Sequence, residues 1–262
     1  MLLKSIEESR LAISECELAN CDHGSHSLSM MQSLKSLEVD EKNREAVVAN
    51  DVVVSIVAGM SKENKQILKD TVLLSSLVAN KRFPGGGVSW YNEFRSMMSY
   101  CGWVSQTRDM SNYKTDNSSF TMEQEGIKIL ASAIAAMAVP TKTAELMLKV
   151  AKDTLEVLQG SEKPLRLFES SSKTHDGAKF AIASSVESPD GEVLIGLGAV
   201  DFTTSLKVTN VLFWEWNSSS VAIKRAEGHM FLNHRHFKEM EPDIMSKLTE
   251  GPRKALMEIP DL

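Results

Sequence analysis

The spacing of apolar residues changes once along this chain, near Pro164. Before that proline, apolar residues recur every three or four positions, which is typical of helices packed on a core. After it, they alternate with polar residues, as in half-buried strands. Ser188–Gly191, with the sequence Ser-Pro-Asp-Gly, predicts a hairpin turn, and the later strands have short polar links. We therefore predict an α+β fold, with N-terminal helices packed on a C-terminal antiparallel sheet of about five strands.

This change separates two structural parts of one predicted domain. A chain of 262 residues can form one compact domain over 1–262, with a mainly helical part, 1–160, and a mainly β part, 161–262, that carries a C-terminal helix. Residues 105–119 are predicted as a polar loop, and 52–57 as either helix or buried strand. We expect helices over 1–20, 61–79, 89–102, 121–139, 141–159 and 241–250, and strands over 165–170, 179–187, 192–204, 206–217 and 219–227.

Charge limits the partners of the chain. Lys and Arg total 29, Asp and Glu total 35, and the net charge is −6. No basic run exceeds a dipeptide, so we expect no nucleic-acid binding, which depends on phosphate neutralisation. Steady attraction to an anionic membrane surface is disfavoured for the same reason.

The chain start and the longest uncharged run bear on its location. Residues 1–8 (MLLKSIEE) lack the apolar core of a secretory signal. The longest uncharged run, 129–141, has 13 residues, whereas a spanning helix needs about 20. We expect a water-soluble protein made in the cytoplasm, without a Sec-type signal peptide and released by an unidentified route.

Two groups of residues resemble metal ligands. Cys16, Cys21, His23 and His26 occupy one short segment, whereas zinc modules normally use two separated arms, so a polar loop is favoured. His229, His234 and His236 lack an identified carboxylate partner and are predicted as surface histidines, with His234 and His236 on one face if they lie in a strand. We predict no metal and no cofactor.

The cysteine count does not suggest a disulfide framework. The chain has three cysteines, an odd and sparse set for which we expect reduced thiols. Cys101 lies at a predicted helix C-terminus, where the dipole disfavours a thiolate, so a buried packing role is favoured. A covalent lipid on this thiol stays open.

No catalytic motif is present. Pro84–Gly87 (Pro-Gly-Gly-Gly) precedes a predicted helix capped by Ser89, and its amides could hold an anion. The segment lacks the Gly-Lys-Ser/Thr ending of a phosphate loop, so a connector is favoured. No Gly-x-Ser-x-Gly or His-Glu-x-x-His pattern occurs either. We predict a non-enzymatic protein without catalytic residues, although an enzyme with a dispersed site would escape this test.

Apolar and aromatic residues provide the candidate contacts. Trp214 and Trp216 are expected on one face of a strand, where core packing competes with contact to a membrane or ligand. Residues 126–139 (GIKILASAIAAMAV) favour a buried core helix. The alternative is a segment that leaves the core and enters a bilayer together with the helix after Pro140. The membrane- or ligand-contact candidates are Trp90, Tyr91, Trp103, Ile129, Ile134, Trp214 and Trp216.

A pattern of packing residues between about 65 and 215 carries a resemblance. It comprises the apolar run 71–81, Trp90-Tyr91, the Gly-Trp-Val-Ser-Gln run 102–106 and Ser-Phe-Thr at 119–121. In these features the chain resembles a group of poorly characterised bacterial proteins that includes insecticidal and virulence proteins of soil bacteria. The resemblance implies a bacterial protein with a toxin function. It assigns no functional role to any residue of this chain.

Three functional hypotheses follow. The first is a non-enzymatic insecticidal or virulence toxin that acts on host cells by receptor binding and membrane damage, such as pore formation. The second is a non-catalytic binding or scaffold module for a protein or hydrophobic ligand, and the third is an enzyme with a dispersed site. The expected partners are a host cell membrane or receptor, and self-association into a homo-oligomer stays open.

Overall fold

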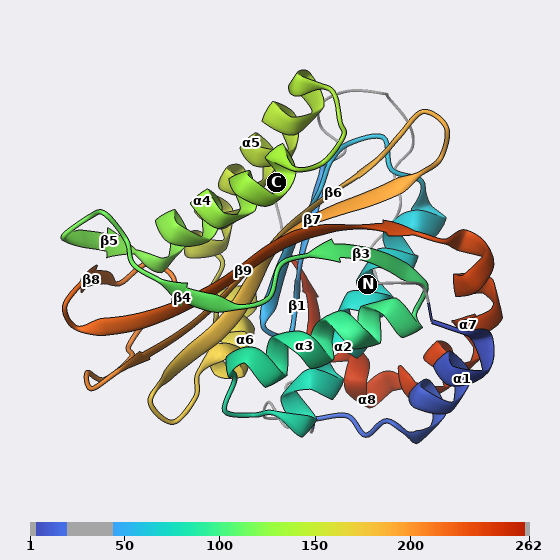
Figure 1. Ribbon diagram of the computed structural model, residues 1–262, viewed down its shortest axis with the longest axis horizontal. Coiled ribbons are helices and arrows are strands. Elements are labelled where there is room, and N and C mark those ends of the chain that lie inside the picture. The colour runs from blue at the N-terminus through green and yellow to red at the C-terminus, as the bar shows by residue number, and fades with distance from the viewer. Residues whose placement is uncertain (1–3, 20–43, 260–262) are drawn as a thin grey trace.

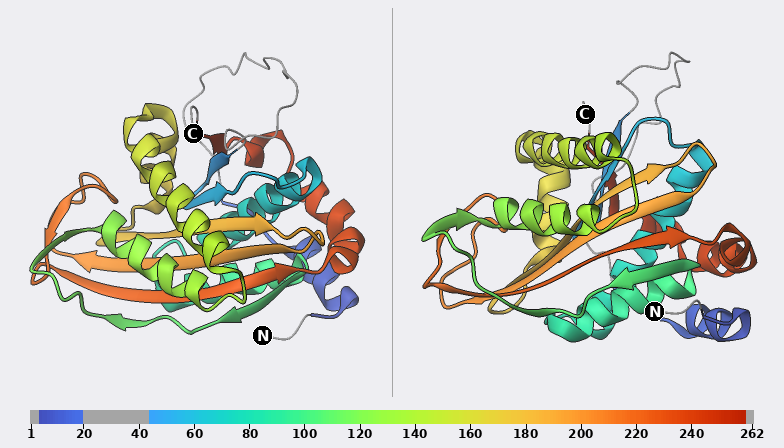
Figure 2. Two further views of the ribbon diagram at one scale, coloured as in Figure 1. Left: turned by 90° about the horizontal axis from the view of Figure 1, so that it is seen from above. Right: turned by 45° about the horizontal axis from the view of Figure 1, so that its top comes forward.

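The chain folds into three layers. A computed structural model describes residues 4–19 and 44–259, with an eight-stranded sheet as the middle layer (Figure 1). Helices α2 (Lys62–Arg82) and α3 (Gly87–Tyr100) pack on one face of the sheet (Figure 2). Helices α4 (Met122–Ala135) and α5 (Thr141–Gly160) lie side by side across the other face (Figure 2). The protein is therefore α+β, as predicted, but helices cover both faces of its sheet.

The helices are spread along the described sequence. Seven of the eight are at least ten residues long, and six of these seven come before the first long strand, β6. Their bounds are α1 Ile6–Glu15, α2 Lys62–Arg82, α3 Gly87–Tyr100, α4 Met122–Ala135, α5 Thr141–Gly160, α6 Glu162–Ser172, α7 His234–Lys247 and α8 Glu250–Arg253.

The strands likewise come from both halves of the chain. Three long strands, β6, β7 and β9, form the centre, and a separate two-stranded sheet pairs β5 with β8. The bounds are β1 Glu45–Ala49, β2 Val52–Ile56, β3 Trp103–Thr107, β4 Ser111–Tyr113, β5 Ser119–Thr121, β6 Gly177–Glu187, β7 Val193–Thr204, β8 Glu215–Asn217, β9 Val221–Leu232 and β10 Leu256–Glu258.

The main sheet has the order β10-β1-β2-β6-β7-β9-β3, and β4 also pairs with β9. Neighbouring strands are antiparallel except β2 and β6, which are parallel. Because the strand ends of β6 and β7 are in register, with Gly177 opposite Thr203, the start of β6 and the end of β7 lie at one end of the sheet. That end carries the surface features described below.

The prediction of a five-stranded C-terminal sheet was wrong. Strands β1 to β4 come from the helical half, and β1 and β2 extend the sheet beyond β6. Strand β2 is buried at every position. A strand covered on both faces shows no polar alternation, so its sequence, Val-Val-Val-Ser-Ile, did not distinguish strand from helix.

Three other segments also differ from the prediction. Residues 165–170 belong to α6, and 206–217 form a loop that ends in the three-residue strand β8. The predicted polar loop 105–119 contains most of β3 and all of β4, which pair with β9. Short, weakly patterned segments take their structure from distant partners, because a strand needs a neighbour to bond with.

Several local signals are confirmed. Ser61 caps α2 by accepting a hydrogen bond from the Asn64 amide, and Thr121 and Gln124 form a capping box at the start of α4. Pro140 separates α4 from α5. The predicted cap at Ser89 was wrong, because α3 begins at Gly87 and its N-cap is Gly86, at a φ of 80°. A glycine adopts this φ without strain.

Helix α4 approaches the sheet closely. A Cβ atom at Gly198 of β7 would lie 2.9 Å from the amide nitrogen of Leu130, and one at Gly196 would lie 3.0 Å from Ile134 Cγ1. These glycines therefore allow α4 to sit directly on β7, with Ile129, Leu130 and Ile134 buried beneath it. Among the described residues, no helix has the length and apolar content needed to cross a bilayer.

Candidate functional site

Most of the predicted contact residues lie in the core. The exposed fraction is at most 2% for six of them, whereas 49% of Trp214 is exposed. Trp216 packs edge-on against Phe202, with a ring-centroid separation of 5.3 Å. The expectation that Trp214 shares a strand face with Trp216 was wrong, because Trp214 precedes β8. The six buried candidates are Trp90, Tyr91, Trp103, Ile129, Ile134 and Trp216.

Residues 126–139 are largely enclosed between the sheet and α5. Ile129, Leu130 and Ile134 face the sheet, and the exposed positions of the segment include Ala135, Ala136 and Ala138. In this structure, the segment is part of the core. Its large apolar side chains are buried, so membrane contact by Ile129 or Ile134 requires a rearrangement.

The loop of residues 205–214 does present apolar side chains. Its middle is anchored, because the side chains of Val211 and Leu212 are buried. Two hydrogen bonds add to this anchor: the Val211 amide donates to the Glu169 carboxylate over 2.6 Å, and the Glu123 amide donates to the Leu212 carbonyl. On either side of this anchor, Leu206 is 54% exposed and Trp214 is 49% exposed. The anchor therefore fixes a loop whose two large apolar side chains face solvent.

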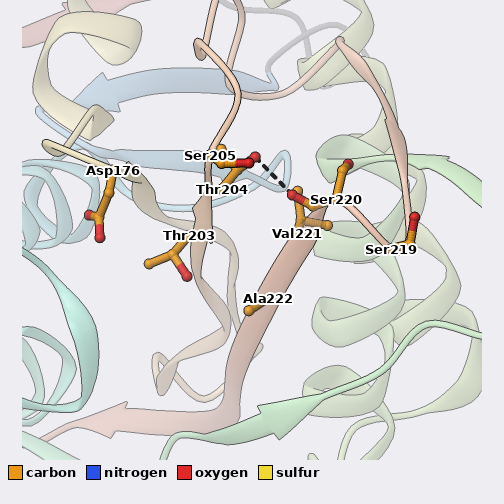
Figure 3. A pocket seen from close by; sticks show the side chains of 8 residues that line it. All are labelled: Asp176, Thr203, Thr204, Ser205, Ser219, Ser220, Val221 and Ala222. Carbon is orange, nitrogen blue, oxygen red and sulfur yellow. Dashed lines mark hydrogen bonds between the residues drawn. The ribbon is translucent and has the colours of Figure 1, made fainter.

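A polar hollow lies beside the start of this loop, where β7 ends and β9 begins (Figure 3). Its volume is about 470 Å³. In Figure 3, Asp176 lies at one side, Ser219 at the other, and the Thr203–Ser205 segment between them. A second hollow shares Asp176, Thr204 and Ser205 and continues towards Leu206 and Lys207. The lining residues of the first are Asp176, Thr203, Thr204, Ser205, Ser219, Ser220, Val221 and Ala222.

A buried charged cluster lies between the start of β6 and the turn that joins β1 to β2, on the face of the sheet that packs against α2 and α3. The Lys179 ammonium is 2.8 Å from an Asp51 oxygen, 3.2 Å from the Ser171 carbonyl and 5.5 Å from the centre of the Trp90 ring. Ser76 donates to the other Asp51 oxygen and accepts from the Asn50 amide. Because these partners satisfy both charges, the pair can remain in the core.

The glycine-rich segment 84–87 does hold an anion, and that anion belongs to the chain itself. The Gly87 amide, at the start of α3, donates to an Asp201 oxygen over 2.7 Å. Burial raises the pKa of Asp201, and the hydrogen bond from Gly87 opposes that rise. The amide is thus occupied by an internal carboxylate.

The described cysteines are packing residues in this structure. Cys16 and Cys101 are both buried and unpaired, and burial raises the pKa of each thiol. Cys101 is the C-cap of α3, which agrees with its predicted place at a helix C-terminus. A raised pKa disfavours the nucleophilic thiolate. Cys21, His23 and His26 lie outside the described residues.

The C-terminal histidines lie on two elements. His229 is on β9, where burial lowers its pKa, whereas His234 and His236 are on helix α7, so the strand that would have put these two on one face does not form. His236 is buried, and its Nε2 lies 3.1 Å from Ser9 Oγ and 3.2 Å from the Tyr100 carbonyl. Within residues 4–19 and 44–259, no three His, Cys, Asp or Glu side chains gather in a way that could hold a metal.

The sequence-based search missed Asp51, Lys179, Asp201 and Asp176. The one available signal was a charged residue within an apolar strand, as at Lys179 in β6 and Asp201 in β7. Such a residue is costly to bury without a partner and therefore marks a specific contact. The hollow gave no signal, because its residues come from three separate segments.

Comparison with known proteins gives weak structural similarity. No family model matches the chain, and no curated protein sequence matches it. A solved structure of the Evf virulence factor has a TM-score of 0.35 and 12% sequence identity, over 77% of this chain and 83% of that one. A structure named delta-endotoxin has a TM-score of 0.32 and 9% identity, over 81% and 90%.

Proposed function

We propose that this chain is a toxin that acts on host cells by binding a receptor and damaging the membrane, without bond-making chemistry. The exposed loop of residues 205–214 carries this proposal. It is anchored by buried residues, yet Leu206 and Trp214 stand in solvent. An indole exposed on an ordered loop suits the interface between water and lipid, where tryptophan is preferred.

The surroundings of this loop support membrane contact. Lys207 is exposed beside Leu206, and a lysine can place its ammonium among lipid head groups while its stem covers apolar surface. Phe83 and Val88 are also exposed, on the segment before and at the start of α3. The Gly87–Asp201 hydrogen bond places this segment near the end of β7, from which the 205–214 loop departs.

The reactive side chains support a non-enzymatic function. Cys101, Asp51 and Lys179 are each at most 1% exposed. A nucleophile or base must reach its substrate within hydrogen-bond distance. In this structure these groups contact one another or the core, and the accessible hollow at the ends of the strands is lined mainly by Ser and Thr residues.

Dye release from lipid vesicles tests the proposal. We expect the chain to release dye and the Trp214→Ser variant to release much less, because serine removes the interfacial anchor. Met245→Ser is the matched control, since Met245 is 46% exposed on α7. Intact vesicles at high protein concentration across the pH range would contradict membrane damage.

Tryptophan fluorescence gives a second readout. Of the four tryptophans, three are buried and Trp214 is exposed. Brominated lipid should therefore quench the Trp214 emission when the loop enters the interface. Equal quenching of the chain and the Trp214→Ser variant would show that this loop is not the contact.

The hollow favours a second candidate function, that of a binding module without membrane damage. Its hydroxyl lining suits a polar ligand better than the hydrophobic ligand first considered. Ligand binding without any dye release would select this function over the first.

A further inference from the structure

The hollow between the end of β7 and the start of β9 is lined by residues whose side chains suit one class of ligand. Thr203, Thr204, Ser205, Ser219 and Ser220 place five hydroxyl groups around it. Each hydroxyl can donate one hydrogen bond and accept others. A ligand that both donates and accepts at several positions therefore fits this wall better than one that only accepts.

The walls of the hollow are held in place by local hydrogen bonds. Thr204 Oγ1 donates to the Ser220 carbonyl over 2.8 Å, which joins the two walls, as the dashed line in Figure 3 shows. The Thr204 amide donates to the Asp176 carbonyl, and the Leu206 amide donates to Thr204 Oγ1. Ser219 and Ser220 are fixed by bonds to Asn217. Such preorganisation lowers the entropic cost of binding.

Three polar side chains of the hollow are left for a ligand. Within the described part of the chain, no hydrogen bond engages the Asp176 carboxylate or the hydroxyl groups of Thr203 and Ser205. All three side chains are exposed. They are therefore accessible acceptors and donors on a rigid frame.

Charge narrows the ligand class further. Asp176 is the charged residue among those lining the first hollow, and it contributes to the raised pKa of nearby Asp201. A carboxylate repels phosphate, sulfate and carboxylate ligands, but it accepts hydrogen bonds from neutral hydroxyl groups strongly. The first hollow thus disfavours anions, whereas the adjoining hollow also has Lys173 and Lys207 in its lining.

The hollow also has apolar surface. Val221 and Ala222 form part of its lining, and Leu206 and Val208 line the adjoining hollow. Hydroxyl and carboxylate groups next to small apolar side chains match a ring that has hydroxyl groups at its edge and C–H groups on its face. A saccharide has this combination.

We propose that the hollow formed by Asp176, Thr203–Ser205 and Ser219–Ala222 binds a neutral saccharide, as carried by a cell-surface glycan. The inference rests on the proposed function, for which it names the chemistry of the receptor. Asp176 accepts hydrogen bonds from the saccharide hydroxyls, Thr203 and Ser205 bond to further hydroxyls, and Val221 and Ala222 contact the ring. No covalent step is involved.

Binding to immobilised saccharides tests the inference. The probes are polyacrylamide conjugates of glucose, galactose, mannose and N-acetylgalactosamine, with a sialic acid conjugate as the anionic comparison. Many weak contacts on one conjugate raise the measurable avidity. We expect saturable binding to at least one neutral conjugate, competed by the free sugar, and no binding to the sialic acid conjugate.

Variants at the hollow then locate the site. Asp176→Asn should weaken binding at least about tenfold, because it removes a charged acceptor, and Thr203→Val should weaken it about two- to tenfold. The matched controls are Asp190→Asn, in the hairpin between β6 and β7, and Ser132→Ala, on α4, which are exposed elsewhere. Both controls should bind as the parent does. Unchanged unfolding free energies show that all four variants fold.

Three results would overturn the inference. They are the absence of binding to every neutral conjugate, equal binding by the Asp176→Asn and Thr203→Val variants, and binding to the anionic conjugate alone. Dye release from vesicles without glycolipid is measured separately. Dye release without saccharide binding refutes the saccharide site and leaves the proposal of membrane damage standing. Saccharide binding without dye release from any vesicle supports the saccharide site and refutes membrane damage.

Discussion

Two polar regions at the same end of the sheet have opposite surroundings. The buried cluster of Asp51, Lys179 and Ser76 satisfies its charges internally, and its exposed fractions are at most 1%. Asp176 lies three residues before Lys179, and Thr203 lies on the neighbouring strand β7, yet these two side chains face solvent and make no hydrogen bond to other described residues. The comparison shows that polarity alone does not identify a functional site. A binding site needs polar groups that the fold leaves accessible.

The largest expected effect comes from breaking the buried cluster. Lys179→Met keeps the aliphatic stem but leaves the Asp51 charge without its cation, so we expect a loss of about 3–5 kcal/mol in the free energy of unfolding. Urea denaturation measures this loss. Lys207→Met, at an exposed lysine, is the control and should change stability by less than about 0.5 kcal/mol. Similar values for both variants would show that the pair is not a structural unit.

The second prediction removes one supporting hydroxyl. Ser76→Ala takes away the donor to Asp51 and the acceptor for Asn50, so we expect a loss of about 1–3 kcal/mol. Ser75→Ala is a matched control, because Ser75 is equally buried but donates to the Thr71 carbonyl of its own helix. The Ser75 variant should lose clearly less stability. Equal losses would mean that Ser76 contributes only through packing.

The third prediction concerns pH and Asp201, which lies between the two regions. Burial raises the pKa of Asp201 above its ordinary value of 3.8. The folded state therefore holds this proton more tightly than the unfolded state, so the contribution of Asp201 to stability is full below pH 3.8 and falls as the pH rises through the raised pKa. Subtracting the stability profile of Asp201→Asn from that of the parent should show this decline. A difference that increases with pH would contradict it.

The smallest expected effect on stability lies at the hollow. Asp176→Asn and Thr203→Val change exposed side chains, and each should alter the free energy of unfolding by less than about 0.5 kcal/mol. Their effect should instead appear in saccharide binding. A large loss of stability at either position would remove the distinction between the two regions and assign the hollow a structural role.

Much of the helical half could be predicted because its signals are local. Ser61 and the Thr121–Gln124 pair mark helix starts through bonds to residues three positions away, and Pro140 marks a break in the chain itself. The long strands β6 and β7 were also predicted close to their bounds. By contrast, β3 pairs with β9 more than a hundred residues later, so no local pattern could place it in the sheet.

The candidate site was predicted only in part. Trp214 and Trp216 have similar local sequence surroundings, but one is exposed on a loop and the other packs on Phe202. The residue type therefore identified both tryptophans as candidates, but it did not show which one is exposed for contact and which one packs in the core. The hollow was not predicted at all, since it forms only where residues 176, 203–205 and 219–222 meet.

The amino-acid sequence by itself determined the mixed α and β character of this protein, its acidic charge and the helix boundaries that depend on capping, because each follows from residue types and short-range hydrogen bonds. Tertiary structure decided which strands form the sheet, which charges are enclosed and which polar groups remain accessible. The physical reason is that burial and pairing depend on neighbours brought together from distant parts of the chain, as Lys179 and Asp51 are.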